Sequence, residues 1–198
     1  MNIKTTSIID IIEMSLNKTF DNITIDDLDR IKYLMINRID YDDVLDVDSN
    51  DLKLFKNLEE LSINNCMIDE EFINNIKSLE KLNKISFINC DFVDDASDYF
   101  NNLIINELIL DSNLGINNIT FSNIHKLVLI NCTFNCIINN IDILDITRSK
   151  DINIDLEKSN YEELIISREH DIDNYLFIKS KIVIKNEYDE EVKVIDNV

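Results

Sequence analysis

The sequence has almost none of the residues that build tight turns, because it contains one glycine and no proline. This scarcity disfavours sandwiches and barrels built on tight turns, and it excludes a glycine-rich loop of the kind that cradles phosphates. It also leaves no proline- or glycine-rich linker, so we predict a single domain. With 198 residues, 45% of them hydrophobic, the chain can bury a sizeable core.

Basic residues are also scarce, since 19 Lys and Arg stand against 39 Asp and Glu, a net charge of −20. Such a surface repels phosphate backbones, so we expect no direct contact with nucleic acid. It suits a basic protein partner, or it serves only to keep the chain soluble and monomeric.

Long apolar runs are missing as well. No window approaches the roughly 18 apolar residues of a membrane helix, and membrane contact is not expected. The opening "MNIKTTSIIDIIEMSL" is interrupted by Asp10 and Glu13 and lacks a small-residue cleavage site, unlike a secretion signal. We therefore expect a cytoplasmic protein with reduced thiols.

The sequence does contain an eleven-residue pattern: apolar, x, x, apolar, x, apolar, x, x, Cys or polar, x, apolar. Its clearest copies are "LEELSINNCMI" from residue 58, "LNKISFINCDF" from 82 and "IHKLVLINCTF" from 124. Further copies begin at 31, 105, 141, 161 and 179, which makes about eight units. Because strand side chains alternate, the paired apolar residues of each unit point into a core that stacked neighbours share.

This pattern resembles the leucine-rich repeat, L-x-x-L-x-L-x-x-N/C-x-L, over residues 31–189. The stretch "ITIDDLDRIKYLMI" resembles the lead-in of bacterial internalin-type members. The resemblance implies an α/β solenoid with a curved parallel sheet on its concave side and helices, then shorter turns, on its convex side. We accordingly divide the single domain into an N-terminal helical cap (1–30), the repeats (31–189) and an acidic C-terminal tail (190–198).

Local patterns add the convex elements. Residues 5–20 predict an amphipathic helix that covers the first strand, and a second helix is predicted after Asp69 as N-cap, with Phe72 and Ile76 on its apolar face. A third helical stretch includes Ala96 and Tyr99. The distance between unit starts then falls from 27 to as few as 17 residues, which predicts extended or 3₁₀ return segments in the later units.

Cys66, Cys90 and Cys132 each take the ninth place of a unit, where Asn113 and Ser149 stand in other units. All three residue types can donate a hydrogen bond, and cysteine is readily buried. We therefore predict inward-pointing donors that bond to a neighbouring unit's carbonyl.

Cysteines can also bind zinc or form a disulfide. Cys132 and Cys136 are spaced C-x-x-x-C without a second pair, which is not a zinc motif. Stacked Cys66 and Cys90 would satisfy disulfide geometry, but a reducing cytosol opposes that bond. Cys136 stands outside the ladder and is the one candidate for a reactive thiol.

An aspartate-rich stretch invites a calcium interpretation, because Asp46, Asp48 and Asn50 match the first three places of a D-x-D-x-N loop. The sixth place is Asp51 where glycine is needed, and the twelfth is Asn57 where a bidentate glutamate is needed. We therefore predict a solvated loop there and no metal site.

The sequence shows no enzyme signature. His125 and His170 have neither the company of a catalytic triad nor an H-E-x-x-H motif. We predict no catalytic residue and no cofactor.

The unit register also predicts which side chains face solvent on the concave side. The central outward column reads Met35, Ser62, Ser86, Ile109, Val128, Asp145, Ile165 and Val183, and the next reads Asn37, Asn64, Ile88, Asp111, Ile130, Thr147, Ser167 and Lys185. We predict an apolar patch of Ile88, Ile109, Val128 and Ile130, rimmed by Ser62, Asn64, Asp111, Asp145 and His125. Such patches often mark interaction sites, although Ile and Val are also simply the favoured strand residues.

These observations predict a non-enzymatic scaffold that binds an unidentified protein through its concave surface. An alternative is an acidic decoy that imitates nucleic acid and blocks a basic nucleic-acid-binding protein, as some phage-encoded inhibitors do. A third, from another class, is an enzyme that uses Cys136 or a bound metal.

Overall fold

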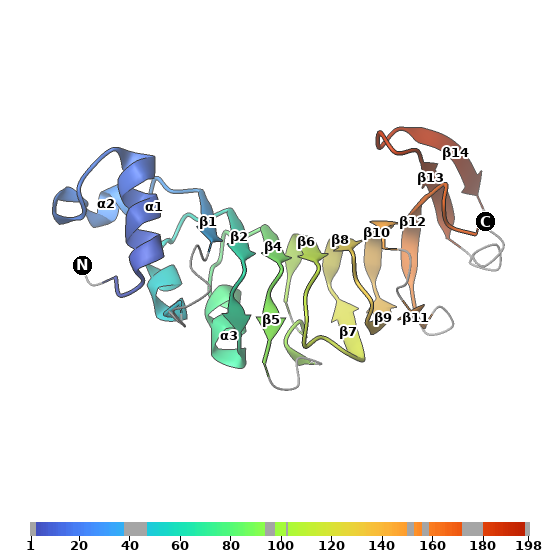
Figure 1. Ribbon diagram of the computed structural model, residues 1–198, viewed down its shortest axis with the longest axis horizontal. Coiled ribbons are helices and arrows are strands. Elements are labelled where there is room, and N and C mark those ends of the chain that lie inside the picture. Colours follow the sequence, from blue (N-terminus) through green and yellow to red (C-terminus); the bar gives the residue numbers. More distant parts are fainter. Residues whose placement is uncertain are drawn as a thin grey trace.

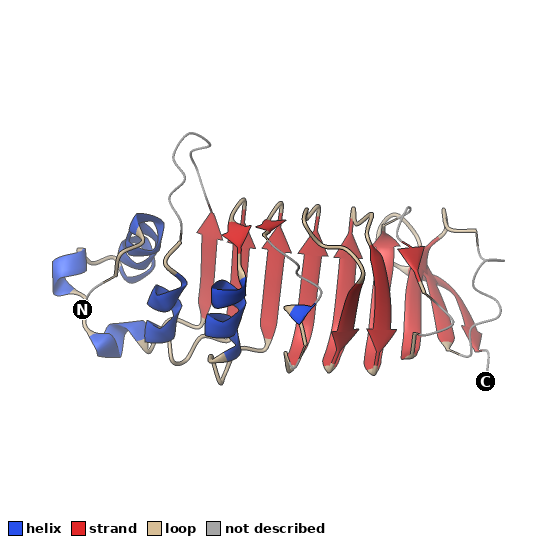
Figure 2. Cartoon of the chain, turned by 90° about the horizontal axis from the view of Figure 1, so that it is seen from below, coloured by secondary structure: helices blue, strands red, loops and turns tan. Residues whose placement is uncertain are grey.

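The computed structural model describes residues 3–37, 47–93, 98–101, 103–149, 153–155, 159–171 and 180–196. These residues form a mostly parallel β-solenoid, in which a long sheet on one side faces short strands and helices on the other (Figures 1 and 2). The hydrophobic core lies between the two sides.

The long sheet has nine strands. Eight of them run parallel and coincide with the eight repeat units of the sequence: β1 (Tyr33–Asn37), β2 (Glu60–Asn64), β4 (Lys84–Ile88), β6 (Ile105–Asp111), β8 (Ile124–Ile130), β10 (Ile141–Arg148), β12 (Tyr161–Ser167) and β13 (Lys181–Lys185). The ninth, β14 (Glu191–Asp196), lies within the predicted acidic tail and pairs antiparallel with β13.

Short strands and helices make the opposite side. One small sheet holds β7 (Ile119–Ser122), β9 (Asn135–Asn139) and β11 (Asn153–Ile154), and the other holds β3 (Met67–Ile68) and β5 (Asp91–Phe92). The short later units thus return through extended segments, as their spacing predicts.

The helical segments of the described chain lie toward its N-terminal end (Figure 2). They are α1 (Thr6–Leu16), η1 (Phe20–Asn22), α2 (Ile25–Leu28), η2 (Ser49–Leu54) and α3 (Glu70–Lys77). α1 buries Ile8 and Ile12 and packs near β1. α3 begins after Asp69, whose carboxylate accepts the Phe72 N–H at 2.7 Å, so the predicted second helix is confirmed. Residues 94–97, with Ala96 of the third predicted helix, lie outside the described ranges.

The inward side chains of the long strands are stacked in one register. Partners align across neighbouring strands from Leu34 to Ile182, and every member is at most 1% exposed: Leu34, Leu61, Ile85, Leu108, Leu127, Leu144, Leu164 and Ile182. Complete burial of such a side chain stabilises the fold by about 1.5–3 kcal/mol. This column is therefore a major source of the fold's stability, and the predicted orientation of the repeat is confirmed.

The ninth-place side chains form a ladder of inward donors. The Cys90 Sγ donates to the Ile63 carbonyl at 3.3 Å, and the Asn113 Nδ2 donates to the Phe87 carbonyl at 2.9 Å. The Asn113 Oδ1 in turn accepts the backbone N–H of Cys90 at 2.9 Å. One amide thus satisfies two buried backbone groups of the preceding coil.

The next two coils repeat this arrangement. The Cys132 Sγ donates to the Leu110 carbonyl at 3.4 Å, and the Ser149 Oγ donates to the Leu129 carbonyl at 2.9 Å while accepting the Cys132 N–H at 3.0 Å. The Cys66 Sγ donates to the Asn64 carbonyl of its own coil at 3.2 Å, and Cys90 and Cys132 make the same kind of bond to Ile88 and Ile130. The predicted inter-unit bonds are confirmed for the four later members.

Left-handed backbone turns are made almost without glycine. In the described part of the chain, nine non-glycine residues have positive φ angles, and seven of them are asparagines: Asn17, Asn65, Asn89, Asn118, Asn123, Asn131 and Asn140. Asparagine tolerates this region better than most residues, because its short side chain can bond locally. The one glycine, Gly115, has φ 74°, and a Cβ there would lie 1.9 Å from the Phe92 carbonyl oxygen.

We predict that Gly115→Ala lowers the free energy of unfolding by at least about 2 kcal/mol, because the new methyl group meets a backbone atom that cannot move aside and the φ angle is unfavourable for alanine. Urea unfolding followed by circular dichroism measures the change. Asn89→Gly, at φ 51°, is the matched control and should stay within about 0.5 kcal/mol of wild type. Equal stabilities for Gly115→Ala and wild type would contradict the close contact with Phe92.

The hydrogen bonds of the ninth-place side chains lead to a second prediction. Asn113→Ala removes both bonds of the amide and leaves the Cys90 N–H and the Phe87 carbonyl without their partner. We expect a loss of about 3 kcal/mol in the free energy of unfolding, since each unsatisfied buried group costs about 1–3 kcal/mol. Asn106→Ala, an exposed asparagine on β6, serves as the control and should change little. A similar loss for both variants would argue against the ladder.

Candidate functional site

The outer face of the long sheet points away from the core and forms the floor of a trough. In Figure 1, α1 and α2 stand above this face at one end, and β13 and β14 rise at the other. Three rows of outward side chains cross the strands, because alternate residues of each strand share a face. We call them the first, middle and third rows, in strand direction.

The middle row matches the predicted central column. Its members pair in sequence across the sheet: Met35, Ser62, Ser86, Ile109, Val128, Asp145, Ile165 and Val183. Ile109 and Val128 are direct partners and are half-buried, so part of each aliphatic side chain faces solvent. Ile165 and Val183 are buried, although they belong to this outer face and not to the main core.

The third row departs from the prediction at one place. Asn37, Asn64, Ile88, Asp111 and Ile130 follow in order, so Asp111 lies between Ile88 and Ile130. The next partner, opposite Ile130, is Arg148 and not Thr147.

A β-bulge between Asp145 and Arg148 causes this shift. The Asp145 carboxylate accepts bonds from the Thr147 N–H at 3.1 Å and from its hydroxyl at 2.8 Å. These bonds hold the extra residue, and bulges of this kind re-aim the side chains that follow. The predicted place of Thr147 is therefore wrong by one residue, and an arginine takes it.

The first row is a ladder of alternating charge that the sequence interpretation missed. It consists of Tyr33, Glu60, Lys84, Glu107, Lys126, Ile143, Glu163 and Lys181. The Glu107 carboxylate bridges Lys84 at 2.9 Å and Lys126 at 3.0 Å, and Lys181 contacts Glu163 at 2.7 Å. Reading the residue two places before each central-column position would have revealed it.

Ion pairing within the first row shifts the pKa values of three of its members. Burial opposes ionisation of Glu107, but hydrogen bonds from Lys84 and Lys126 outweigh it and lower the pKa of Glu107. The hydrogen bond to Glu107 raises the pKa of Lys84, and that to Glu163 raises the pKa of Lys181. These shifts favour the charged forms of Glu107, Lys84 and Lys181. The three carboxylates and three ammonium groups of the row sum to zero net charge.

The predicted rim residues lie in different settings. Ser62 and Asp145 are buried in the floor of the trough, whereas Asn64 and Asp111 are half-buried at strand ends. Asp111 accepts bonds from Ser112 at 2.7 Å and Asn131 at 3.2 Å. His125 is exposed near the start of β8, at the opposite end of that strand from Ile130, and its Nδ1 contacts Asp142.

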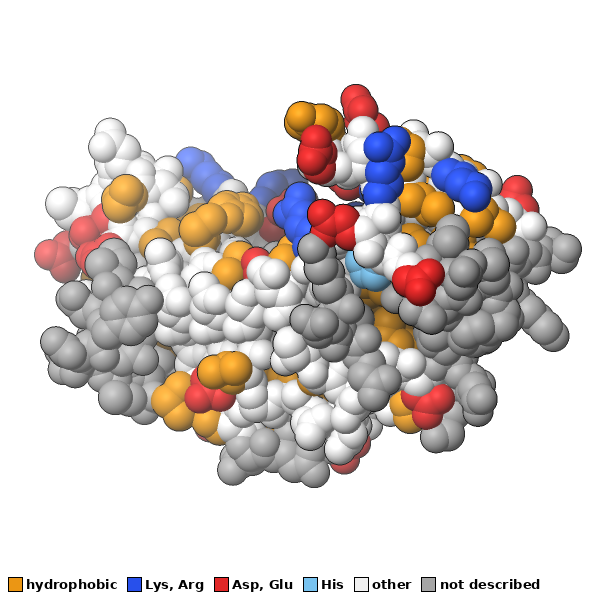
Figure 3. Space-filling view, turned by 45° about the vertical axis from the view of Figure 1, so that its right-hand side comes forward, with side chains coloured by type: hydrophobic (Ala, Val, Ile, Leu, Met, Phe, Trp, Pro, Cys, Tyr) orange, Lys and Arg blue, Asp and Glu red, His pale blue; other side chains and the backbone are white. Residues whose placement is uncertain are grey.

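The C-terminal hairpin extends the apolar part of this face. Val194 of β14 pairs with Val183 of β13, so the two side chains share one side of the sheet. Val192 lies at the register shift of this pair, and both Val192 and Val194 are exposed. Figure 3 shows this raised end of the molecule, where hydrophobic side chains lie beside charged ones.

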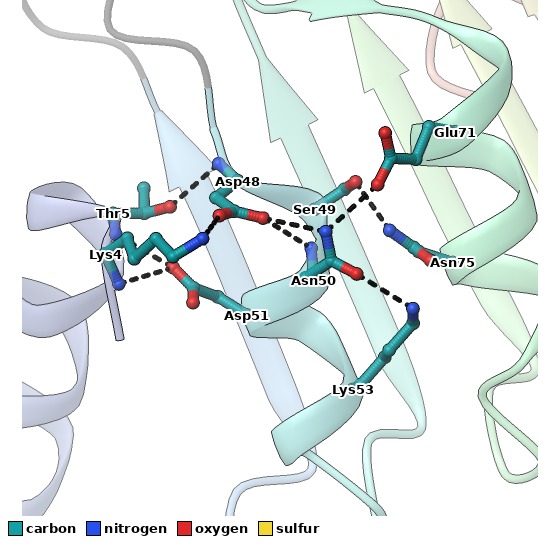
Figure 4. Close-up of polar contacts among 9 residues, drawn as sticks. All are labelled: Lys4, Thr5, Asp48, Ser49, Asn50, Asp51, Lys53, Glu71 and Asn75. Atoms are coloured by element: carbon teal, nitrogen blue, oxygen red, sulfur yellow. Dashed lines mark hydrogen bonds and ion pairs between the residues drawn. The ribbon is translucent and has the colours of Figure 1, made fainter. Parts of the chain in front are cut away.

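The aspartate-rich segment is occupied by protein contacts. The Asp51 carboxylate accepts the backbone N–H groups of Lys4 and Thr5 at 3.0 and 2.8 Å, and Asp48 contacts the Lys4 Nζ at 2.6 Å (Figure 4). Asn50 joins Asp48 to Glu71. This network fastens the N-terminal segment to η2 and α3, while Asp46 lies outside the described ranges.

Metal and membrane features can be judged over the same ranges. Among the described residues, no group of three His, Cys, Asp or Glu side chains is placed to hold a metal ion. Within those ranges there is also no helix with the length and apolar character to cross a bilayer.

The thiols are buried and weakly acidic. Burial raises the pKa of Cys90 to about 11 and those of Cys132 and Cys136 to about 12. Since the thiolate is the reactive form, these cysteines are poor nucleophiles at neutral pH. Cys136, the candidate reactive thiol, is only 2% exposed.

Comparison with known proteins adds no relative: no family model, curated protein or solved structure matches this chain.

We predict that the folded protein reacts with Ellman's reagent at pH 8 at least about 100-fold more slowly than in 8 M urea, because a pKa near 11 leaves about one thiol in a thousand ionised and burial blocks access. Absorbance at 412 nm follows the reaction, and the denatured sample should release four equivalents, one for each cysteine. One thiol that reacts rapidly in the folded state, lost in Cys136→Ser, would contradict this and would favour the thiol-enzyme alternative.

Proposed function

We propose that this protein is a non-enzymatic scaffold that binds another protein along the outer face of its long sheet. The observation that carries the proposal is the aliphatic group made by Ile109 and Val128 with Ile88 and Ile130, half-buried on neighbouring strands. Exposed apolar groups beside polar ones are typical of interaction sites. A parallel sheet stacked on one core offers them on a rigid platform.

The shape and charge of the trough support this use. The raised ends in Figure 1 limit a partner to the face between α1 and the β13–β14 hairpin. The first row, whose net charge is zero, presents both positive and negative side chains along one side of the apolar group. A partner segment with an apolar centre and alternating charges would match both features.

The acidic-decoy alternative is supported by the net charge of −20. Its acidic surface would have to lie elsewhere, since the first row of the trough carries as many lysines as glutamates. Exposed carboxylates do occur on α3, at Glu70 and Glu71, and on the C-terminal hairpin. The charge balance of the trough favours the scaffold.

The proposal includes the type of solenoid and its setting. We assign the coils to the leucine-rich repeat type, because the strand positions and the ninth-place ladder follow that pattern. In this view α1 and α2 form an N-terminal cap that covers the exposed end of the solenoid. The protein would act as a monomer in the cytoplasm, without a cofactor or catalytic group.

We predict that changing Ile88, Val128 and Ile130 together to Lys abolishes capture of the partner in a pull-down from the source cell, because three charges replace the apolar contact. Fold should survive, since half-buried lysines can extend their ammonium groups into solvent. The proteins retained by wild type and by the variant are compared by mass spectrometry, and circular dichroism checks the fold.

Met14→Lys, Met67→Lys and Leu114→Lys together form the control, with the same added charge at exposed apolar positions outside the three rows. Partner capture by this control should equal that by wild type. Raising NaCl from 0.1 to 0.5 M separates the two functions, because decoy binding weakens steeply with salt. A folded patch variant that still captures the partner would overturn the scaffold proposal.

A further inference from the structure

One surface pocket, distinct from the proposed partner site, is lined by several cationic side chains, although the chain as a whole is acidic. It has a volume of about 440 Å³ and lies where β10, β12 and β13 end, beside the turn of the β13–β14 hairpin. Its cationic lining consists of Arg148, Arg168 and Lys185. The whole sequence contains only four arginines, so half of them line this one hollow.

Neither guanidinium has a partner in the described part of the chain. Lys185 pairs with Asp189 at 3.0 Å, whereas Arg148 and Arg168 form no side-chain hydrogen bond or ion pair with any described residue. Glu169 and Glu187 line the same hollow. With about two carboxylates for every cation in this sequence, two neighbouring guanidinium groups that lack a partner among the described residues are an unusual arrangement.

Two local structural features position these arginines: a β-bulge and the hydrogen bonds of a histidine. The bulge held by Asp145 brings Arg148 into the third row, opposite Ile130. Without the bulge, Thr147 would hold that place and Arg148 would alternate to the other side of the strand. Bulges recur next to functional sites for this reason.

The second feature is a pair of hydrogen bonds made by the His170 ring. Its Nε2 donates to the Ser149 carbonyl at 3.0 Å, and its Nδ1 accepts the Ser167 N–H at 3.2 Å. The ring therefore joins the residue after Arg148 to the residue before Arg168. The Arg168 N–H also donates to the Lys185 carbonyl at 3.1 Å, which ties the third cationic segment to the same place.

We propose that this hollow binds a phosphate monoester. Guanidinium groups present paired N–H donors in a planar fork that matches phosphate oxygens bidentately. A phosphate monoester offers three oxygens and a charge of about −1.5 to −2 at pH 7, which two free guanidinium groups balance. This proposal does not rest on the partner proposed for the apolar group, although Arg148 lies opposite Ile130.

Isothermal titration calorimetry at pH 7.5 in 150 mM NaCl tests the site with three probes: inorganic phosphate, O-phosphoserine, and a short phosphoserine peptide beside its unphosphorylated form. At this ionic strength charges beyond about 8 Å are largely screened, so the overall negative charge contributes little. We expect saturable one-to-one binding of the phosphorylated probes and none of the unphosphorylated peptide. Peptide binding at least tenfold tighter than that of phosphate would identify a phosphoprotein as the source, and equal binding a free phosphate compound.

Arg148→Gln with Arg168→Gln should weaken binding at least tenfold, and circular dichroism should be unchanged because both side chains are exposed. The matched control is Arg30→Gln with Lys56→Gln, which removes the same charge near the N-terminal end and should stay within twofold of wild type. Absence of saturable binding by wild type up to 10 mM probe would overturn the proposal. Equal binding by the two double variants would do so too, because phosphate would then bind elsewhere.

Discussion

Parallel pairing that keeps the core column aligned from β1 to β13, with one shift after Asp145, is the constraint on which the rest of the molecule depends. It stacks Leu61 on Ile85 and Leu108 on Leu127, and in the same step it fixes which side chains face outward. A slip by one residue would exchange the core column for the outward rows. The charged ladder, the aliphatic group and the ninth-place donors therefore exist only as long as this register holds.

Much of the fold could be predicted because the spacing of apolar residues in each repeat determines the strand register. The spacing of Leu58, Leu61 and Ile63 specifies both a strand and its inward face, and Asp69 before an amphipathic stretch specifies a helix start. The last strand was harder to predict. In "EVKVID" the alternation of Val192 and Val194 is strand-like, but the surrounding carboxylates favour an open tail, and only pairing with β13 decides between them.

The candidate face was predicted in outline and missed in detail. Ile109 and Val128 meet as the columns require, since regular strands keep them aligned. Thr147 lies out of place because the Asp145 side chain bonds to the backbone two residues on, a local competition that no periodicity reveals. The burial of Ser62 and Asp145 depends on the size of the neighbouring side chains across the sheet. The outward column read from the sequence gives the direction of a side chain but not how much of it its neighbours cover.

The antiparallel direction of β14 has a consequence for how such a chain can change in length. A parallel coil added after β13 would have to displace β14 from the edge that it occupies. A coil duplicated between two interior strands meets no such obstacle, because each coil contacts mainly its neighbours. The antiparallel β14 thus occupies the edge of β13 that a further parallel coil would need, whereas an interior duplication leaves that edge unchanged.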